Sequence, residues 1–145
     1  MKNIFFHSAD KVFKFKGKKD LKAFIAQLFA TEKKVFSSLN YIFCSDEYLL
    51  TINQSFLKHD YYTDIITFNL AETPKENIEG EIYISLDRTK ENATTHQTNE
   101  KDEILRVIFH GALHLCGYRD KKASEIRLMR AKEDYYLSLF KNTAL

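Results

Sequence analysis

Apolar residues recur along this chain with two periods, and each period predicts a different kind of element. One set follows the i, i+3, i+4, i+7 spacing of an amphipathic helix with a single core-facing stripe: Leu21, Phe24, Ile25, Leu28 and Phe29. Residues 38–44, 64–68 and 80–85 are short runs in which β-branched and aromatic side chains favour strands. A fourth strand is predicted over 13–16, where phenylalanines alternate with lysines.

Four more helices are predicted, and for two of them a carboxylate is placed where it can cap the first turn. These carboxylates are Asp46, for a helix through about residue 56, and Asp87, for one through about residue 96. A third helix is predicted to begin at Asp102. The helix that Asp102 opens has an apolar side, which consists of Ile104, Leu105, Ile108, Ala112 and Leu115. The last helix is predicted from about residue 124 to 140.

The order of these elements favours a single α+β domain over residues 1–145, with a mixed sheet of about four strands packed against about five helices. The regular strand–helix alternation of a doubly wound sheet is absent from the pattern. The polar segment 71–79 contains the only proline and is predicted to be a loop. A length of 145 residues, with 44% hydrophobic and 29% charged residues, suits one soluble domain with a sizeable core.

Composition excludes several classes of protein. No apolar run approaches the roughly 18 residues of a membrane span, and the N-terminus lacks the apolar core of a signal peptide, so we expect a cytoplasmic protein with no membrane partner. Two cysteines, Cys44 and Cys116, are too few for a disulfide framework. Cys116 lies two residues after His114, about 200° around a helix, so its thiol is expected to point away from any ion bound there.

Charge is distributed unevenly, although the formal net charge is only +2. Residues 1–34 hold nine lysines against three acidic residues, and the remainder of the chain is net acidic. The lysines that follow residue 10 have two interpretations. They either bind the phosphates of RNA or protect a solvated edge strand over 13–16 from pairing with other strands.

Candidate metal chemistry lies near the C-terminal end of the helix that begins at Asp102. His110 and His114 are four residues apart, so on a helix their imidazoles share one face and can hold one ion together. Gly117 is well placed to end the helix and let Asp120 return as a third ligand. Two histidines and one carboxylate leave a coordination position open, as in a catalytic zinc site. The alternative is that both histidines are ordinary polar residues on a partly exposed face.

Residues 110–118 read HGALHLCGY, and two earlier segments read TDIITF at 63–68 and GEIYIS at 80–85. These segments, with Asn53, Phe56 and Asp60 ahead of them, resemble the motifs of the YbeY family. Members of that family are bacterial endoribonucleases and ribosomal-RNA maturation factors that carry a metal, usually taken as zinc. The similarity covers roughly residues 46–120.

The resemblance implies a function and a site. It implies a single-strand-specific, metal-dependent endoribonuclease that acts in maturation of the 16S rRNA 3′ end and in ribosome assembly. Its partners would be RNA, namely the rRNA precursor and the ribosomal subunit, and one zinc ion per chain would bind His110, His114 and Asp120. The family usually has a third histidine where this chain has Asp120, and commonly an arginine where it has Leu57.

Three residues are candidate catalytic groups: His59, Arg106 and Asp64. Asp64 lies in the TDIITF segment. Arg106 comes one turn before His110 and either meets a substrate phosphate or forms a surface ion pair with an acidic residue earlier in the helix. His59 either supplies a positive or proton-carrying group in place of the missing arginine or is a solvated loop histidine.

Phosphodiester cleavage is the reaction that these residues favour, and two other functions compete with it. A metalloprotease of the HExxH type has a glutamate after its first histidine, whereas this chain has Gly111, which counts against that function. Gly111 also predicts the close approach of another backbone beneath the site. The second alternative is a non-catalytic ribosome-assembly factor that keeps the metal for stability and binds RNA through its lysines.

Overall fold

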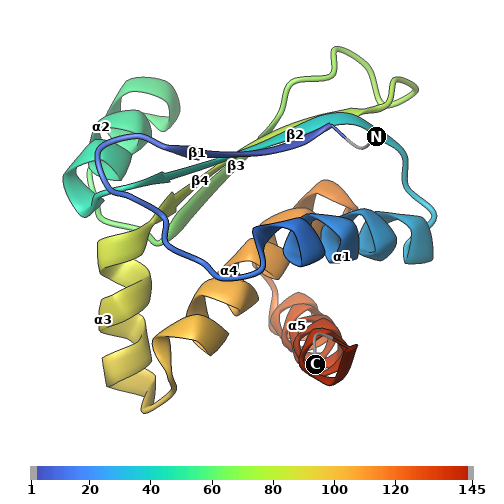
Figure 1. Ribbon diagram of the computed structural model, residues 1–145. Coiled ribbons are helices and arrows are strands. Elements are labelled where there is room, and N and C mark those ends of the chain that lie inside the picture. Colours follow the sequence, from blue (N-terminus) through green and yellow to red (C-terminus); the bar gives the residue numbers. More distant parts are fainter. Residues whose placement is uncertain (1–2, 144–145) are drawn as a thin grey trace.

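The computed structural model describes residues 3–143, and in this part of the chain four strands form one mixed sheet that packs with five helices (Figure 1). The strands are β1 (Ile4–Ser8), β2 (Phe36–Cys44), β3 (Ile65–Asn69) and β4 (Ile78–Ser85). The helices are α1 (Lys18–Thr31), α2 (Asp46–Leu57), α3 (Leu86–His96), α4 (Glu100–Leu115) and α5 (Ala123–Thr143). The predicted α+β class is confirmed.

The sheet has the strand order β1-β2-β4-β3, in which β1, β2 and β4 are parallel and β3 is antiparallel to β4. The strand predicted over 13–16 is wrong, because residues 12–15 have no regular structure and the sheet edge is β1 instead. Phe13 is buried from this loop, and its ring stacks on that of Phe43 with centroids 3.7 Å apart. The alternation of phenylalanine and lysine therefore comes from a loop that turns its rings inward.

The capping roles predicted for Asp46 and Asp87 are also wrong, and α4 begins at Glu100, two residues before the predicted start at Asp102. In the first turns of α2, α3 and α4, the backbone N–H groups donate to the side chains of Ser45, Ser85 and Asn99. Asp46, Asp87 and Asp102 lie one to three residues later, inside the first turn. A carboxylate there still interacts favourably with the positive end of the helix, which explains why these residues occur where they do.

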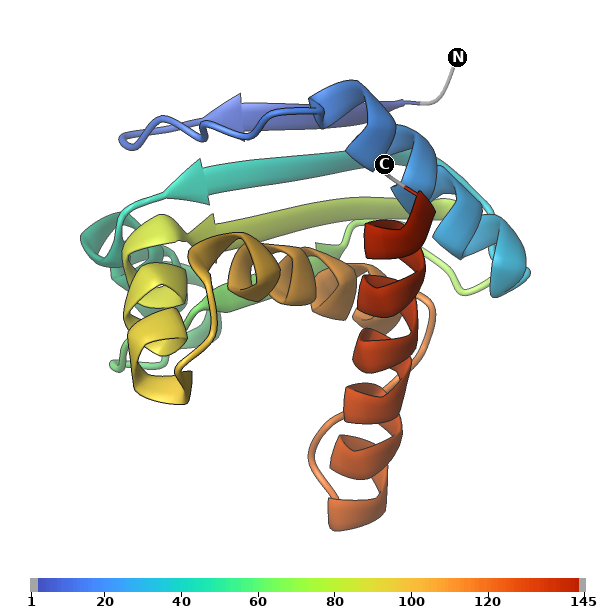
Figure 2. The same cartoon turned by 60° about the horizontal axis from the view of Figure 1, so that its bottom comes forward.

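Helix α4 is the centre of the core, and α1 and α5 lie on the same side of the sheet (Figures 1 and 2). Its predicted apolar side is confirmed as buried. A Cβ at Gly111 would lie 3.0 Å from Ile65 Cδ1 and from Ile82 Cγ2. The close neighbours of Gly111 are thus side chains of β3 and β4, and the predicted approach of another backbone is wrong.

Helix α2 covers part of the opposite face of the sheet, where Leu49 packs with Cys44 and Ile66 in a smaller apolar cluster. None of the helices within residues 3–143 is long and apolar enough to cross a membrane.

Candidate metal centre

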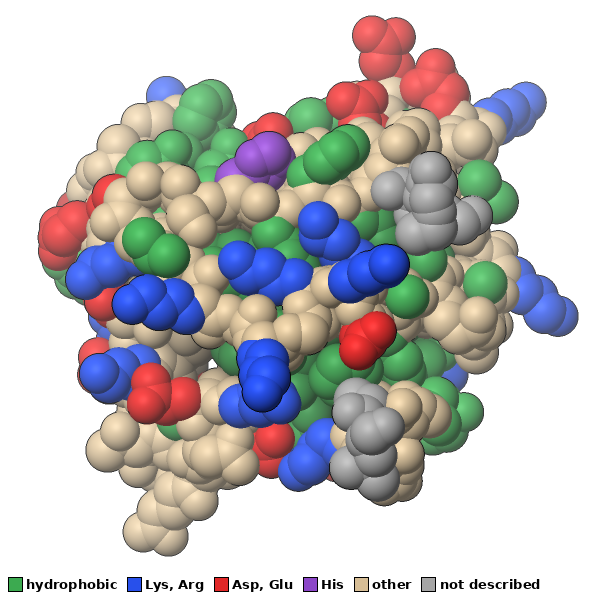
Figure 3. All heavy atoms as spheres, viewed as in Figure 1, with side chains coloured by type: hydrophobic (Ala, Val, Ile, Leu, Met, Phe, Trp, Pro, Cys, Tyr) green, Lys and Arg blue, Asp and Glu red, His purple; other side chains and the backbone are tan. Residues whose placement is uncertain are grey.

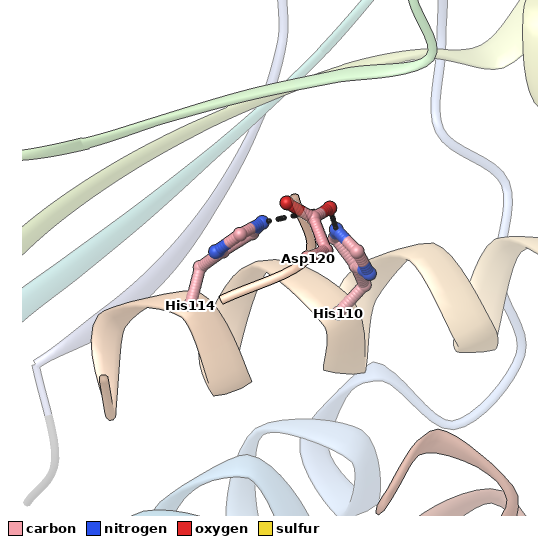
Figure 4. Close-up of side chains that lie close together, drawn as sticks. All are labelled: His110, His114 and Asp120. Carbon is pink, nitrogen blue, oxygen red and sulfur yellow. Dashed lines mark hydrogen bonds and ion pairs between the residues drawn. The ribbon is translucent and has the colours of Figure 1, made fainter. Parts of the chain in front are cut away.

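The two histidines of α4 and the aspartate beyond it converge on one point (Figure 4). His110 Nε2 lies 3.2 Å from Asp120 Oδ2, and His114 Nε2 lies 3.3 Å from the same oxygen. The two imidazole rings are nearly perpendicular, at 83°. Ligand atoms arranged tetrahedrally about 2.0–2.1 Å from a zinc ion lie about 3.3 Å apart. The spacing of this donor set therefore fits a small divalent cation.

The turn after α4 brings Asp120 back to the histidines. Gly117 has φ +107°, a left-handed conformation that favours glycine, and its N–H donates to the carbonyl of His114. The N–H of Tyr118 donates to the carbonyl of Leu113, which completes a Schellman motif. The prediction that Gly117 ends the helix is confirmed, and the reversal directs the following residues along the face that carries the imidazoles.

Hydrogen bonds at the far side of each ring set its orientation. His114 Nδ1 lies 2.9 Å from the carbonyl oxygen of Tyr118, and His110 Nδ1 lies 2.6 Å from Glu133 Oε2. A carbonyl can only accept, so the proton of neutral His114 is on Nδ1 and its Nε2 lone pair points at Asp120. Two acceptors facing each other at this distance repel unless a cation lies between them. The chemistry of the donors, like their spacing, fits a metal ion.

Glu133, on α5, contacts two residues of the candidate site and was not among the site residues predicted from the sequence. Its side chain is only 6% exposed, and it accepts hydrogen bonds from both His110 and Arg106. Burial lowers the pKa of His110, but the hydrogen bond and charge of Glu133 outweigh this effect and raise it above its ordinary value. The available signal was a lone acidic residue in the buried stripe of the last helix, where charge is rare without a partner.

The metal centre opens into a cleft of about 640 Å³ between β3, α3, α4 and α5. Its ionisable lining, besides the histidines, consists of four carboxylates and two guanidinium groups: Asp64, Glu103, Asp120, Glu133, Arg106 and Arg130. Thr67 Oγ1 also lies at this cleft, and it is buried without a hydrogen-bond partner among residues 3–143. Polar groups thus surround a space large enough for a nucleotide-sized ligand.

Two of the three candidate catalytic residues line the cleft. Arg106 donates to Glu133 at 3.0 Å and to Asp134 at 2.7 Å, both on α5 and not on its own helix. Asp64 accepts from Asn92 Nδ2 at 3.3 Å. Burial raises the pKa of its carboxyl, although the nearby charge of His110 opposes the rise.

His59 lies on the loop after α2 and is not among the residues that line the cleft. Its ring stacks on Tyr61 with centroids 5.1 Å apart, and its Nδ1 lies 2.9 Å from the Tyr61 hydroxyl. Cys116, as expected, is not in the cluster of ligand atoms, and burial raises the pKa of its thiol to about 12. The catalytic roles of His59, Arg106 and Asp64 remain predictions.

Comparison with known proteins gives a consistent result. The family model described as Endoribonuclease YbeY matches residues 4–141. A protein named Endoribonuclease YbeY from Cytophaga hutchinsonii is 50% identical over 138 residues, which are 95% of this chain and 96% of that protein. This chain belongs to the YbeY family. Its resemblance to YbeY over residues 46–120 thus extends to nearly the whole sequence.

Two further comparisons agree with this assignment. Endoribonuclease YbeY from Flavobacterium psychrophilum is 45% identical over 116 residues, which are 80% of this chain and 81% of that protein. The solution structure of TM1509 from Thermotoga maritima superimposes with a TM-score of 0.58 at 29% identity, and covers 97% of this chain and 89% of that one. The α+β fold of this chain is therefore shared with a solved structure.

Proposed function

We propose that this chain is a single-strand-specific, metal-dependent endoribonuclease that acts in the cytoplasm, in maturation of the 16S rRNA 3′ end and in ribosome assembly. Its partners are the rRNA precursor and the ribosomal subunit. The observation that carries the proposal is the convergence of two imidazole nitrogens on one carboxylate oxygen at the floor of an open cleft. Relatives that are named endoribonucleases and are 45% and 50% identical support the reaction class.

We propose zinc as the resident ion, bound by His110, His114 and Asp120, because zinc accepts mixed nitrogen and oxygen donors in a shell of this size. A bound zinc ion supplies a Lewis acid for a phosphate oxygen and lowers the pKa of a water molecule that it holds. Glu133 and the Tyr118 carbonyl keep both imidazoles oriented with Nε2 toward the ion.

The remaining chemistry is assigned to groups in the same cleft. Asp64 is the carboxyl best suited to take up a proton during cleavage, because burial raises its pKa. Arg106 supplies positive charge that attracts a phosphate, and its ion pairs with Glu133 and Asp134 hold the guanidinium in place. His59 is proposed as a contact to RNA that extends beyond the cleft.

The non-catalytic assembly factor is the second candidate, because Leu57 stands where the resemblance leads us to expect an arginine. In that case the metal only holds the segment after α4 against the helix. A protease function lacks the glutamate that the HExxH motif requires, since Gly111 occupies that position.

Substitution of Asp120 tests the proposal. Asp120→Ala is expected to lose bound metal and RNA cleavage together, because two imidazoles alone leave the donor set incomplete. Asp120→His is expected to keep the metal and to shift the pH profile of cleavage toward acid, since a neutral ligand lowers the pKa of bound water more than a carboxylate does. Elemental analysis gives the metal content, and a labelled single-stranded RNA gives cleavage with and without chelator.

Asp20→Ala is the control, because Asp20 is an exposed aspartate on α1, away from the cleft. A full equivalent of tightly held metal in Asp120→Ala would remove Asp120 from the site. Parent protein that carries metal but cleaves no RNA would favour the assembly factor.

A further inference from the structure

A second concave surface lies beside the first turns of α3 and α4, and none of the residues that line it also lines the metal cleft. This groove, of about 450 Å³, is formed by residues 11–16 and by the first turns of α3 and α4. It contains five lysines: Lys11, Lys14, Lys16, Lys90 and Lys101. Figure 3 shows Lys and Arg side chains gathered across the face that carries the segment between β1 and α1.

Most of this positive charge is not neutralised within the protein. Lys11 forms an ion pair with Asp87 at 3.4 Å, and Glu100 is the only other acidic residue in the lining. The other four lysines have no carboxylate within 4 Å among residues 3–143. Lys101 Nζ instead lies 5.4 Å from the ring centroid of Phe15, which forms part of the groove wall. Ammonium groups held over aromatic surface remain free to bind an anion.

The metal cleft does not offer comparable charge, because its carboxylates outnumber its arginines. Phosphates of an RNA strand outside the cleavage point must therefore find their cations elsewhere. The two concavities share α3 and α4. Asn92 and His96 line the cleft, whereas Thr89 and Lys90 line the groove. Because the same two helices line both concavities, a strand that follows this helix pair out of the cleft reaches the lysines.

The other interpretation of these lysines does not fit the fold. Protection of a sheet edge requires lysines on the edge strand, and the edge strand β1 (Ile4–Ser8) contains none. The lysines of residues 11–16 line a concave surface instead.

We propose that the groove of residues 11–16, α3 and α4 binds the phosphate backbone of single-stranded RNA whose cleavage point lies in the metal cleft. That the bound polyanion is RNA rests on the proposed function. The groove contacts no reacting atom, so it adds affinity for long RNA and leaves the metal centre unchanged. Lysines beside aromatic rings in a groove are the features with which proteins bind single strands independently of sequence.

The test compares two triple variants that remove the same charge. Lys14→Gln, Lys16→Gln and Lys101→Gln alter the groove, whereas Lys33→Gln, Lys34→Gln and Lys75→Gln alter exposed lysines outside it. Binding is measured by fluorescence anisotropy with labelled RNA of about 5 and about 20 nucleotides, over a range of salt concentrations. The RNA carries 2′-O-methyl groups, which resist cleavage, so that binding is measured on protein with an intact metal centre.

The groove variant is expected to bind the long RNA more weakly and to lower the slope of log K against log salt by about 2, which corresponds to three lost phosphate contacts. Its binding of the short RNA is expected to change no more than in the control variant, and its melting temperature and metal content are expected to match the parent. Equal salt slopes in the groove and control variants would overturn the proposal, and so would equal losses for short and long RNA.

The two proposals fail separately. If parent protein with bound metal cleaves no RNA but the groove variant loses affinity for long RNA, the proposed cleavage is wrong and RNA binding by the groove is supported. If RNA is cleaved and the salt slopes are identical, only the proposed RNA binding by the groove is wrong.

Discussion

A single buried carboxylate, Glu133, links the candidate metal centre to the rest of the cleft. It accepts from the His110 imidazole at 2.6 Å and from the Arg106 guanidinium at 3.0 Å. A carboxylate behind a ligating histidine fixes the ring and makes its free nitrogen a stronger donor to the ion. In the proposed zinc site Glu133 is therefore a positioning residue, because it would act on the ion through His110.

Glu133→Gln is expected to lower zinc affinity by about 10- to 100-fold, because a neutral amide is a weaker acceptor for the His110 N–H. Competition with a chromophoric chelator measures this affinity. Asp134→Asn is the matched control, since Asp134 is 59% exposed and pairs with Arg106 but not with a histidine. An equal loss of affinity in both variants would mean that the effect runs through Arg106 and not through His110.

At the scale of elements, α4 and its C-terminal turn carry most of the site. The helix places His110 and His114 on one face, and the left-handed residue Gly117 reverses the chain so that Asp120 meets them. A Cβ at Gly117 would meet no atom within 4 Å outside the neighbouring residues, so the constraint on alanine at this position is conformational. Gly17, before α1, is likewise constrained only by its backbone conformation, since its φ is +92° and a Cβ there would meet no atom within 4 Å.

Gly117→Ala and Gly17→Ala are each expected to lower the free energy of unfolding by about 1–2 kcal/mol, because an L-residue is strained at these dihedral angles. Only Gly117→Ala is expected to weaken metal binding as well, since only that turn positions Asp120. Urea unfolding in chelator gives the stability, and titration with zinc gives the affinity. Metal affinity that is unchanged in Gly117→Ala would show that the path of residues 118–120 does not depend on the turn.

At the scale of the whole molecule, Glu32 joins three parts of the chain that are distant in sequence. From the end of α1 it accepts from Tyr118, beyond α4, at 2.7 Å, from Lys132 on α5 at 3.3 Å, and from the Tyr136 hydroxyl. Burial raises the pKa of Glu32, but the three hydrogen bonds and the charge of Lys132 outweigh it, so the pKa is below the ordinary value of 4.5. Tyr118 also carries the carbonyl that orients His114.

Glu32→Gln is expected to lower the free energy of unfolding by about 1–3 kcal/mol at pH 7 and by less at acidic pH. The sign follows from the lowered pKa. The Glu32 carboxylate stabilises the fold fully above pH 4.5, which is its pKa in the unfolded chain. This stabilisation is lost as the pH falls through the lower pKa of Glu32 in the folded protein. Unfolding in urea between pH 7 and acidic pH measures this difference in stability. Glu47→Gln, which removes an exposed carboxylate that also accepts from a tyrosine, is the control. A difference between parent and Glu32→Gln that is constant with pH would contradict the explanation.

Local features of the sequence determined much of what the structure contains. The 3.6-residue period of Leu21 to Phe29, the four-residue spacing of the histidines and the glycine that ends α4 are properties of adjacent residues, so they predicted α1, the paired imidazoles and the turn correctly. The cap positions were wrong because a serine precedes Asp46 by one residue and Asp87 by two, and both serine and aspartate can cap a helix.

Other features depend on pairing between distant segments, which the sequence leaves open. Alternating phenylalanine and lysine suits both a strand and a loop with inward-facing rings, and only the pairing of β1 with β2 decided that residues 4–8 form the sheet edge. The sequence alone proposed Asp120 as a ligand, but its approach to both histidines needed the folded turn. Glu133 lies 23 residues from His110, and the lysines of residues 11–16 meet α3 and α4 only in three dimensions. Helix packing determines these contacts, because the periodicity of a sequence segment does not specify which face of another helix it packs against.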